Sequence, residues 1–253
     1  MEAVWIFHRF GLWGASRMLH VIVGIMWMGL LWFFNFVQTP AYAEMEPAAR
    51  NNAFDKVTWR ALWWFRWAAA ATVASGILIL LFGGFGDNDI YNSSFFKSPS
   101  GLTLSVGILF GITMFLNVWL VIWPNQQTVI ANARNVQAGG QADPAAATAA
   151  RKGALASRMN TIFSLPLLVF MVGASHFWQT TGFDQRPGGG ARAAWLVIAL
   201  AIWIVLELNC LGIIGGFGTG GTNVIYDTHQ NALWAGVALI VIFYILTEIL
   251  FAA

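Results

Sequence analysis

Charged residues are scarce in this chain of 253 residues. Lys and Arg together number 13 and Asp and Glu number 11, so 9% of the residues are charged, whereas an ordinary globular domain carries about 25%. A water-soluble surface needs many more charged side chains than this. With 58% hydrophobic residues, the composition argues strongly against a soluble enzyme and predicts an outer surface that mostly faces lipid.

Cysteine is nearly absent as well, since Cys210 is the single one and lies inside an apolar run. One thiol excludes a disulfide framework, a CxxC metal site and covalent c-type haem attachment through CxxCH. The net charge of +2 is explained by the basic loops that orient membrane proteins. No nucleic-acid partner is therefore expected.

Long hydrophobic runs are what the sequence has in abundance. A bilayer core of about 30 Å requires about 20 apolar helical residues, and six stretches meet that requirement. They are residues 18–37, 60–82, 101–123, 157–178, 193–216 and 230–252. The sequence therefore predicts an all-α fold, a polytopic integral membrane helical bundle that forms a single membrane domain over residues 1–253.

The sequence also predicts the structure of the N-terminal segment, of one long connection and of the span that contains a proline. Met1–Arg17 lacks the features of a signal peptide, so it is expected to remain and to lie in the membrane interface. The connection Pro124–Ala156 contains many Ala, Gly and Gln residues and is expected to be a mobile cytoplasmic loop with some helix. Pro166 is expected to kink the fourth span and to free a carbonyl that Ser164 or a neighbouring helix can satisfy.

The distribution of Lys and Arg predicts the orientation. The N-terminus and the second and fourth loops hold five of these residues, whereas the other three loops, together with Arg66 just inside the second span, hold eight. Because cytoplasmic loops carry the excess of positive charge, both termini are expected outside the cytoplasm.

Two histidines lie at the same predicted depth in the outer half of the membrane. His20 is near the start of the first span and His176 near the end of the fourth. Two imidazoles from facing helices are a common way for a helical bundle to hold a b-type haem. Gly24 and Trp27 follow His20 on the same helix face, and the glycine is expected to leave room for the flat porphyrin.

Other interpretations of the histidines remain open. His20 and His176 are also explained as interfacial residues solvated by headgroups, with the glycines serving close helix packing. His8 is expected at the surface. His229 follows Asp227 and Thr228, and these three residues are expected to start the last helix rather than to bind a metal.

Two ionisable residues are predicted to lie deep in the membrane. Arg66 in the second span and Glu207 in the fifth are at comparable depth, and a charge at such depth is seldom without a partner. An ion pair between them is expected, which either joins two helices or lines a pocket for an anionic or proton-bearing substrate. Four further polar residues are expected to extend this polar seam: Asn117, Asn160, Thr161 and Asn209.

The glycine-rich run from Gly215 to Asn223 looks like a phosphate-binding loop at first sight. Such a loop requires a preceding strand and a following helix in a βαβ unit, whereas this run follows a membrane span. The sequence therefore predicts a flexible turn between spans five and six.

Separated stretches of the chain resemble one known family. They are Arg17–Pro40 (RMLHVIVGIMWMGLLWFFNFVQTP), Arg60–Trp67 (RALWWFRW), Asn117–Asn125 (NVWLVIWPN) and Ser157–His176 (SRMNTIFSLPLLVFMVGASH). In this order they resemble the urate oxidase N-terminal domain, the membrane domain of the bacterial cytochrome c-linked urate hydroxylase. The start of the first span, from His20 to Gly29, is also similar to a haem-binding protoporphyrinogen oxidase family and a copper-resistance family.

The resemblance implies a redox protein of the bacterial inner membrane that passes electrons to a periplasmic cytochrome c. It also implies haem b, with His20 and His176 on the iron and Gly24 and Trp27 beside it. In the family a cytochrome c domain follows the membrane domain, but this sequence contains no CxxCH, so a separate cytochrome c is expected as the partner. Whether the chain is itself an enzyme stays open. The alternative is a non-catalytic accessory or structural subunit of a larger membrane complex.

Overall fold

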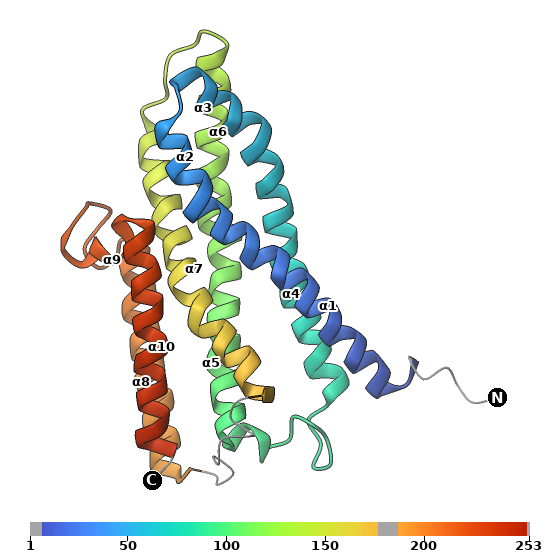
Figure 1. The fold of residues 1–253 in the computed structure, drawn as a ribbon. Helices are drawn as coiled ribbons and strands as arrows, with labels where there is room; N and C mark the ends of the chain where they lie inside the picture. Colours follow the sequence, from blue (N-terminus) through green and yellow to red (C-terminus); the bar gives the residue numbers. More distant parts are fainter. Residues whose placement is uncertain (1–6, 177–186, 252–253) are drawn as a thin grey trace.

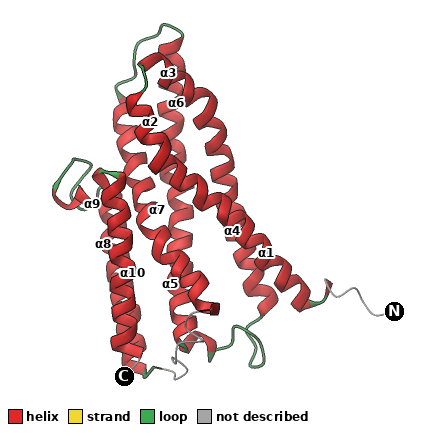
Figure 2. Cartoon of the chain, viewed as in Figure 1, coloured by secondary structure: helices red, strands yellow, loops and turns green. Residues whose placement is uncertain are grey.

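The computed structural model of the chain describes residues 7–176 and 187–251. Figure 2 shows that these residues form helices joined by loops, without a strand. Six of the helical segments are long and apolar enough to cross a membrane. The all-α, polytopic membrane bundle predicted from the sequence is thereby confirmed.

The first three crossings each contain a π-helical segment. The first is α1 (Arg9–Trp32), η2 (Phe33–Gln38) and α2 (Thr39–Glu44); the second is α3 (Pro47–Ala53), η3 (Phe54–Thr58) and α4 (Trp59–Gly83); the third is α5 (Pro99–Leu116), η5 (Asn117–Ile122) and α6 (Trp123–Gln137). π-Helical turns are rare inside α-helices and occur often at functional sites. A short 3₁₀ turn, η4 (Phe95–Lys97), precedes α5.

The last three crossings are continuous α-helices. They are α7 (Ala145–His176), α8 (Gly189–Cys210) and α10 (His229–Phe251). The connection from α8 to α10 contains η6 (Gly221–Asn223) and the one-turn helix α9 (Val224–Asp227). The start of α10 has the expected cap, because the Thr228 hydroxyl accepts a hydrogen bond of 3.0 Å from the Asn231 backbone N–H.

The helices differ in length, and this gives the bundle two unlike ends. α8 and α10 have 22 and 23 residues, enough to cross a bilayer core of about 30 Å. The other four crossings have 32 to 39 residues and project beyond α8 and α10 on the side of α2, α3 and α6 (Figure 1). We call this side the α3 end, and we call the opposite side, where α1 begins and α10 ends, the terminal end.

One expectation for a connecting segment is wrong. Most of Pro124–Ala156 is helical, because α6 continues to Gln137 and α7 begins at Ala145. Residues 9–17 are the first turns of α1, and their position in the membrane interface stays a prediction. Arg9 fixes this end of α1 to α4, since it donates hydrogen bonds to the Phe82 and Gly83 carbonyls and forms an ion pair with Asp89. Residues 1–6 lie outside the described part of the chain.

An aromatic core joins four crossings at the centre of the bundle. The Phe110 ring of α5 stacks on the Phe163 ring of α7 with centroids 4.3 Å apart, and Phe170, Phe243 and Trp195 pack around them. Trp195 is completely buried in this core. The core holds α5, α7, α8 and α10 together.

Candidate functional site

His20 lies on the face of α1 that packs along α4. Its Nδ1 is 2.9 Å from the Thr72 carbonyl oxygen and 3.1 Å from the Ser75 hydroxyl. A carbonyl oxygen only accepts, so this geometry puts the proton on Nδ1 and leaves the lone pair on Nε2. A Cβ at Gly76 would lie 3.3 Å from His20 Cε1, so this glycine of α4 makes room for the ring.

Gly24 and Trp27 continue this face of α1. A Cβ at Gly24 would have one neighbour within 4 Å, the Thr72 methyl group at 3.9 Å, and the Trp27 side chain is 1% exposed in the core. Gly24 therefore faces α4 at Thr72, and the clearance that it gives a porphyrin stays a prediction.

His176 does not lie beside His20. α1 and α7 meet where Trp32 Nε1 donates a hydrogen bond of 3.0 Å to the Ser164 hydroxyl, and each histidine follows this contact by the same number of residues toward the terminal end. The equal depth of the two histidines in the membrane stays a prediction. Below the contact, however, α1 tilts away from α7 (Figure 1), and the His176 Nδ1 contacts the Ser175 hydroxyl and the Val172 carbonyl of its own helix. The described structure does not bring the two rings together.

A buried polar seam connects three crossings nearer the α3 end. The Asn117 amide donates to the Asn160 side-chain oxygen (3.1 Å) and to the Glu207 carboxylate (3.3 Å), and Asn160 donates to the Met114 carbonyl (2.9 Å). Glu207 also contacts the Cys210 thiol one turn later on α8. Asn117 is the first residue of η5, so the seam lies at one of the π-helical segments.

Two of the residues expected in this seam have other partners. The Thr161 hydroxyl donates to the Ser157 carbonyl of its own helix, and Asn209 donates to groups in the connection that follows α8. Asn35, which sequence reasoning missed, lies in η2 and donates to the Ser157 hydroxyl of α7 (2.9 Å). An asparagine inside an otherwise apolar first span was the available signal.

Arg66 and Glu207 do not form the predicted ion pair. The Arg66 guanidinium lies 3.9 Å from the centre of the Trp123 ring, whereas Glu207 interacts with Asn117 and Cys210. Figure 1 shows the reason, since α5 and α7 lie between α4 and α8. Equal depth along two helices does not make their side chains neighbours.

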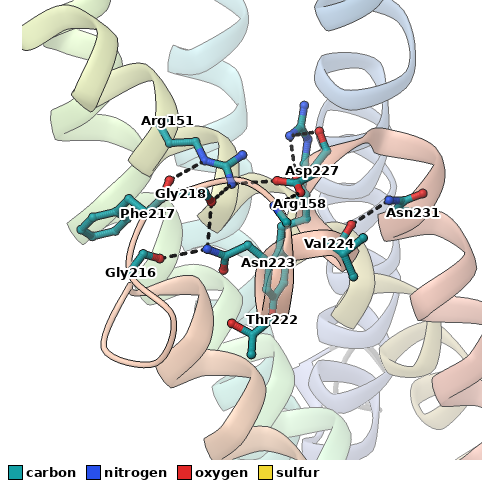
Figure 3. A network of polar contacts seen from close by, with 12 residues as sticks. Arg151, Arg158, Gly216, Phe217, Gly218, Thr222, Asn223, Val224, Asp227 and Asn231 are labelled. Atoms are coloured by element: carbon teal, nitrogen blue, oxygen red, sulfur yellow. Dashed lines mark hydrogen bonds and ion pairs between the residues drawn. The ribbon is translucent and has the colours of Figure 1, made fainter.

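The connection between α8 and α10 forms a polar cap at the α3 end (Figure 3). Arg151 of α7 donates to the Phe217 and Gly218 carbonyls and forms an ion pair of 2.8 Å with Asp227. Asn223 donates to the Gly216 and Gly218 carbonyls. The glycine-rich run is thus a connecting turn between α8 and α10, and hydrogen bonds hold its conformation.

Asp227 is the charged centre of this cap. Burial acts to raise its pKa, but hydrogen bonds from the Gly220 backbone N–H and from Arg151, with the positive charges of Arg151 and Arg158, hold the pKa below its ordinary value. A carboxyl with a lowered pKa in the folded state stabilises the fold above its unfolded pKa and loses this contribution as the pH falls through the folded pKa.

We therefore expect Asp227→Asn to lower the free energy of unfolding at neutral pH by about 1 kcal/mol, because a charged acceptor is lost. The difference from wild type should shrink as the pH falls below about 4, where the aspartate itself becomes protonated. Thermal unfolding of both proteins in detergent, at pH values from about 3 to about 7, measures this difference on both sides of the ordinary carboxyl pKa. A difference that is constant over the range would contradict the electrostatic role of Asp227.

Comparison with known protein families gives a match for the central part of the chain. The family model described as urate oxidase N-terminal matches residues 89–208. Over this segment the chain is similar to the urate oxidase N-terminal family. No curated protein and no solved structure matched the chain.

The segment that matches the urate oxidase N-terminal family model contains α5, α6, α7 and most of α8. It includes the seam residues Asn117, Asn160 and Glu207, and also His176. His20 and Arg66 precede it. The resemblance noted from residues 117–125 and 157–176 is thereby confirmed.

Proposed function

We propose that the protein is a redox subunit of the bacterial inner membrane, related to the membrane domain of urate hydroxylase, which holds haem b on His20 and passes electrons to a separate periplasmic cytochrome c. The observation that carries the proposal is the state of the His20 ring. Histidines that ligate metals usually donate their other ring N–H to a carbonyl or carboxylate, and His20 Nδ1 has the Thr72 carbonyl at 2.9 Å.

The chain's own residues prepare this histidine as an axial ligand. Thr72 selects the tautomer with a free Nε2, Ser75 contacts the same nitrogen, and Gly76 gives the ring its space. Haem, when bound, supplies one-electron transfer. The proposal rests on His20, because the divergence of α1 and α7 separates it from His176, the second expected ligand.

A visible absorption spectrum of the purified protein, oxidised and then reduced with dithionite, tests the proposal. Sharp α and Soret bands in the reduced protein are expected for a haem b with strong axial ligands. A colourless protein that is prepared without loss of the fold would overturn the proposal.

A second candidate function is that of an accessory subunit without a cofactor. A shallow apolar groove of about 450 Å³ between α1 and α4 favours it, lined by Ile25, Met26, Gly29, Leu30 and Trp64. A Cβ at Gly29 would have no atom within 4 Å, and membrane helices associate through small residues of this kind. A colourless protein that migrates with a larger complex on native gels of solubilised membranes would select this candidate.

We further propose that both termini are periplasmic. Six crossings place the chain ends on one side, and the connections with the larger number of Lys and Arg residues lie at the α3 end. Alkaline phosphatase, which matures only outside the cytoplasm, should be inactive when fused within residues 137–149 and active when fused after the last residue. Activity of the first fusion would reverse the orientation.

A further inference from the structure

Arg66 lies against a set of indole rings at the junction of α4 with η5 and α6. Its guanidinium carbon is 3.9 Å from the Trp123 ring centre, 5.1 Å from that of Trp119 and 5.9 Å from that of Trp67. We call these four residues the Arg66 cluster. Cation–π contacts stabilise an arginine at such distances, but they do not satisfy the N–H groups at the edge of the guanidinium.

The Arg66 cluster contains no negative charge. Within the described residues the acidic side chains in ion pairs are Asp55, Asp89 and Asp227, and their partners are other cations. The Nε of Arg66 is buried and has no hydrogen-bond partner. A buried donor of a charged group without an acceptor is strongly unfavourable, so the cluster is incomplete without an anion.

The depth of the cluster is set by its neighbours. Trp123 is the first residue of α6, and the next turn of this helix faces Gly153 of α7 through Asn125 and Gln126. Further along α7, the Arg158 side chain donates to the carbonyls of residues 226 and 227, immediately before α10 begins. Since α6 and α7 run in opposite directions, Trp123 lies between these two levels. The Arg66 cluster is therefore at the level where α10 enters the membrane, which is the level of the lipid headgroups.

The outer side of the cluster is exposed and aromatic. Trp63, Trp64 and Trp67 are 47%, 55% and 48% exposed, and the Trp63 ring packs edge-on against the Trp64 ring. Indoles prefer the boundary between headgroups and acyl chains. An anion that reaches Arg66 from this side comes from the bilayer.

We propose that the Arg66 cluster binds the phosphate group of an anionic phospholipid in the leaflet at the α3 end. The guanidinium edge offers paired N–H donors whose geometry matches two phosphate oxygens, while the indole faces hold the guanidinium and the exposed tryptophans contact the acyl chains. The site is independent of the proposed haem function, since it shares no residue with the surroundings of His20.

Native mass spectrometry of the full chain, purified from nanodiscs of phosphatidylcholine and phosphatidylglycerol, tests the proposal. The wild type is expected to retain phosphatidylglycerol, and Arg66→Gln to bind it about tenfold more weakly, because the charge-assisted hydrogen bonds to the phosphate are lost. Arg66→Lys, which keeps the charge but loses the paired donors, should bind with intermediate strength. Arg60→Gln is the matched control, since Arg60 is on the same helix and donates to the Lys56 carbonyl.

Three other results of these experiments would overturn the proposal. Equal retention by Arg66→Gln and wild type, in proteins with the same helical content, would show that the lipid binds elsewhere. Equal stabilisation by inorganic phosphate alone would identify a free anion as the ligand. Equal retention of phosphatidylcholine and phosphatidylglycerol would show that the negative charge of the headgroup is not recognised.

Discussion

Replacing His20 by alanine is expected to abolish haem retention and the reduced α and Soret bands. Under the proposed function, Nε2 of His20 is the group that binds iron, and the Thr72 carbonyl holds the ring in the required tautomer. Alanine removes the ligand, while the small side chain leaves the contact between α1 and α4 otherwise intact. The loss is measured as haem per protein chain from the pyridine haemochrome spectrum.

Two further variants define which histidines take part. His229→Ala is the control, because His229 begins α10 at the α3 end, where its ring packs against Phe36, and the spectrum should not change. His176→Ala shows whether the end of α7 supplies a second ligand. If His20→Ala retains haem at full occupancy with the same low-spin bands, the assignment of His20 fails.

Gly236→Leu is expected to destabilise the bundle by several kcal/mol, at or above the range of about 1–3 kcal/mol for overpacked cores. A Cβ at Gly236 of α10 would lie 3.0 Å from the Ile162 carbonyl oxygen and 2.7 Å from the Leu165 side chain. Pro166 cannot donate to Ile162, its partner four residues earlier, and Ser164 donates to Thr161 instead. The backbone of α10 thus packs closely against the carbonyl that the proline leaves free.

A substitution at an open glycine provides the comparison. Gly29→Leu adds the same atoms to α1 at a position where a Cβ would have no atom within 4 Å, so its melting temperature should match or exceed that of wild type because leucine favours the helix. Thermal unfolding in one detergent measures both variants. Similar melting temperatures for the two would contradict the close packing of α7 and α10.

The number of crossings was predictable from residue composition because a bilayer core demands a minimum length of apolar helix. The ends of the long crossings were not predictable in the same way. Residues 124–137 and 145–156 are rich in polar and small residues, yet they are helical in α6 and α7. Their helices are stabilised by packing outside the hydrocarbon region, which a hydrophobicity criterion does not measure.

Position along each helix was predictable too, because it follows from the rise of about 1.5 Å per helical residue. His20 and His176 follow the contact between Trp32 and Ser164 by the same number of residues. Which side chains meet at a given depth was not predictable, as the separate partners of Arg66 and Glu207 demonstrate. The π-helical segments add to the difficulty, because an extra residue in a turn rotates all later side chains relative to the expected period.

The class of the protein, its six crossings and its resemblance to the urate oxidase N-terminal family all followed from the amino-acid sequence. The tertiary structure alone decided that Thr72 faces both His20 and Gly24, that Asn117 joins Asn160 to Glu207, and that Arg66 lies among indoles without an acid. The physical reason is that hydrophobic length and helical rise act within one helix, whereas tilt, rotation and neighbour choice arise from the packing of several helices at once.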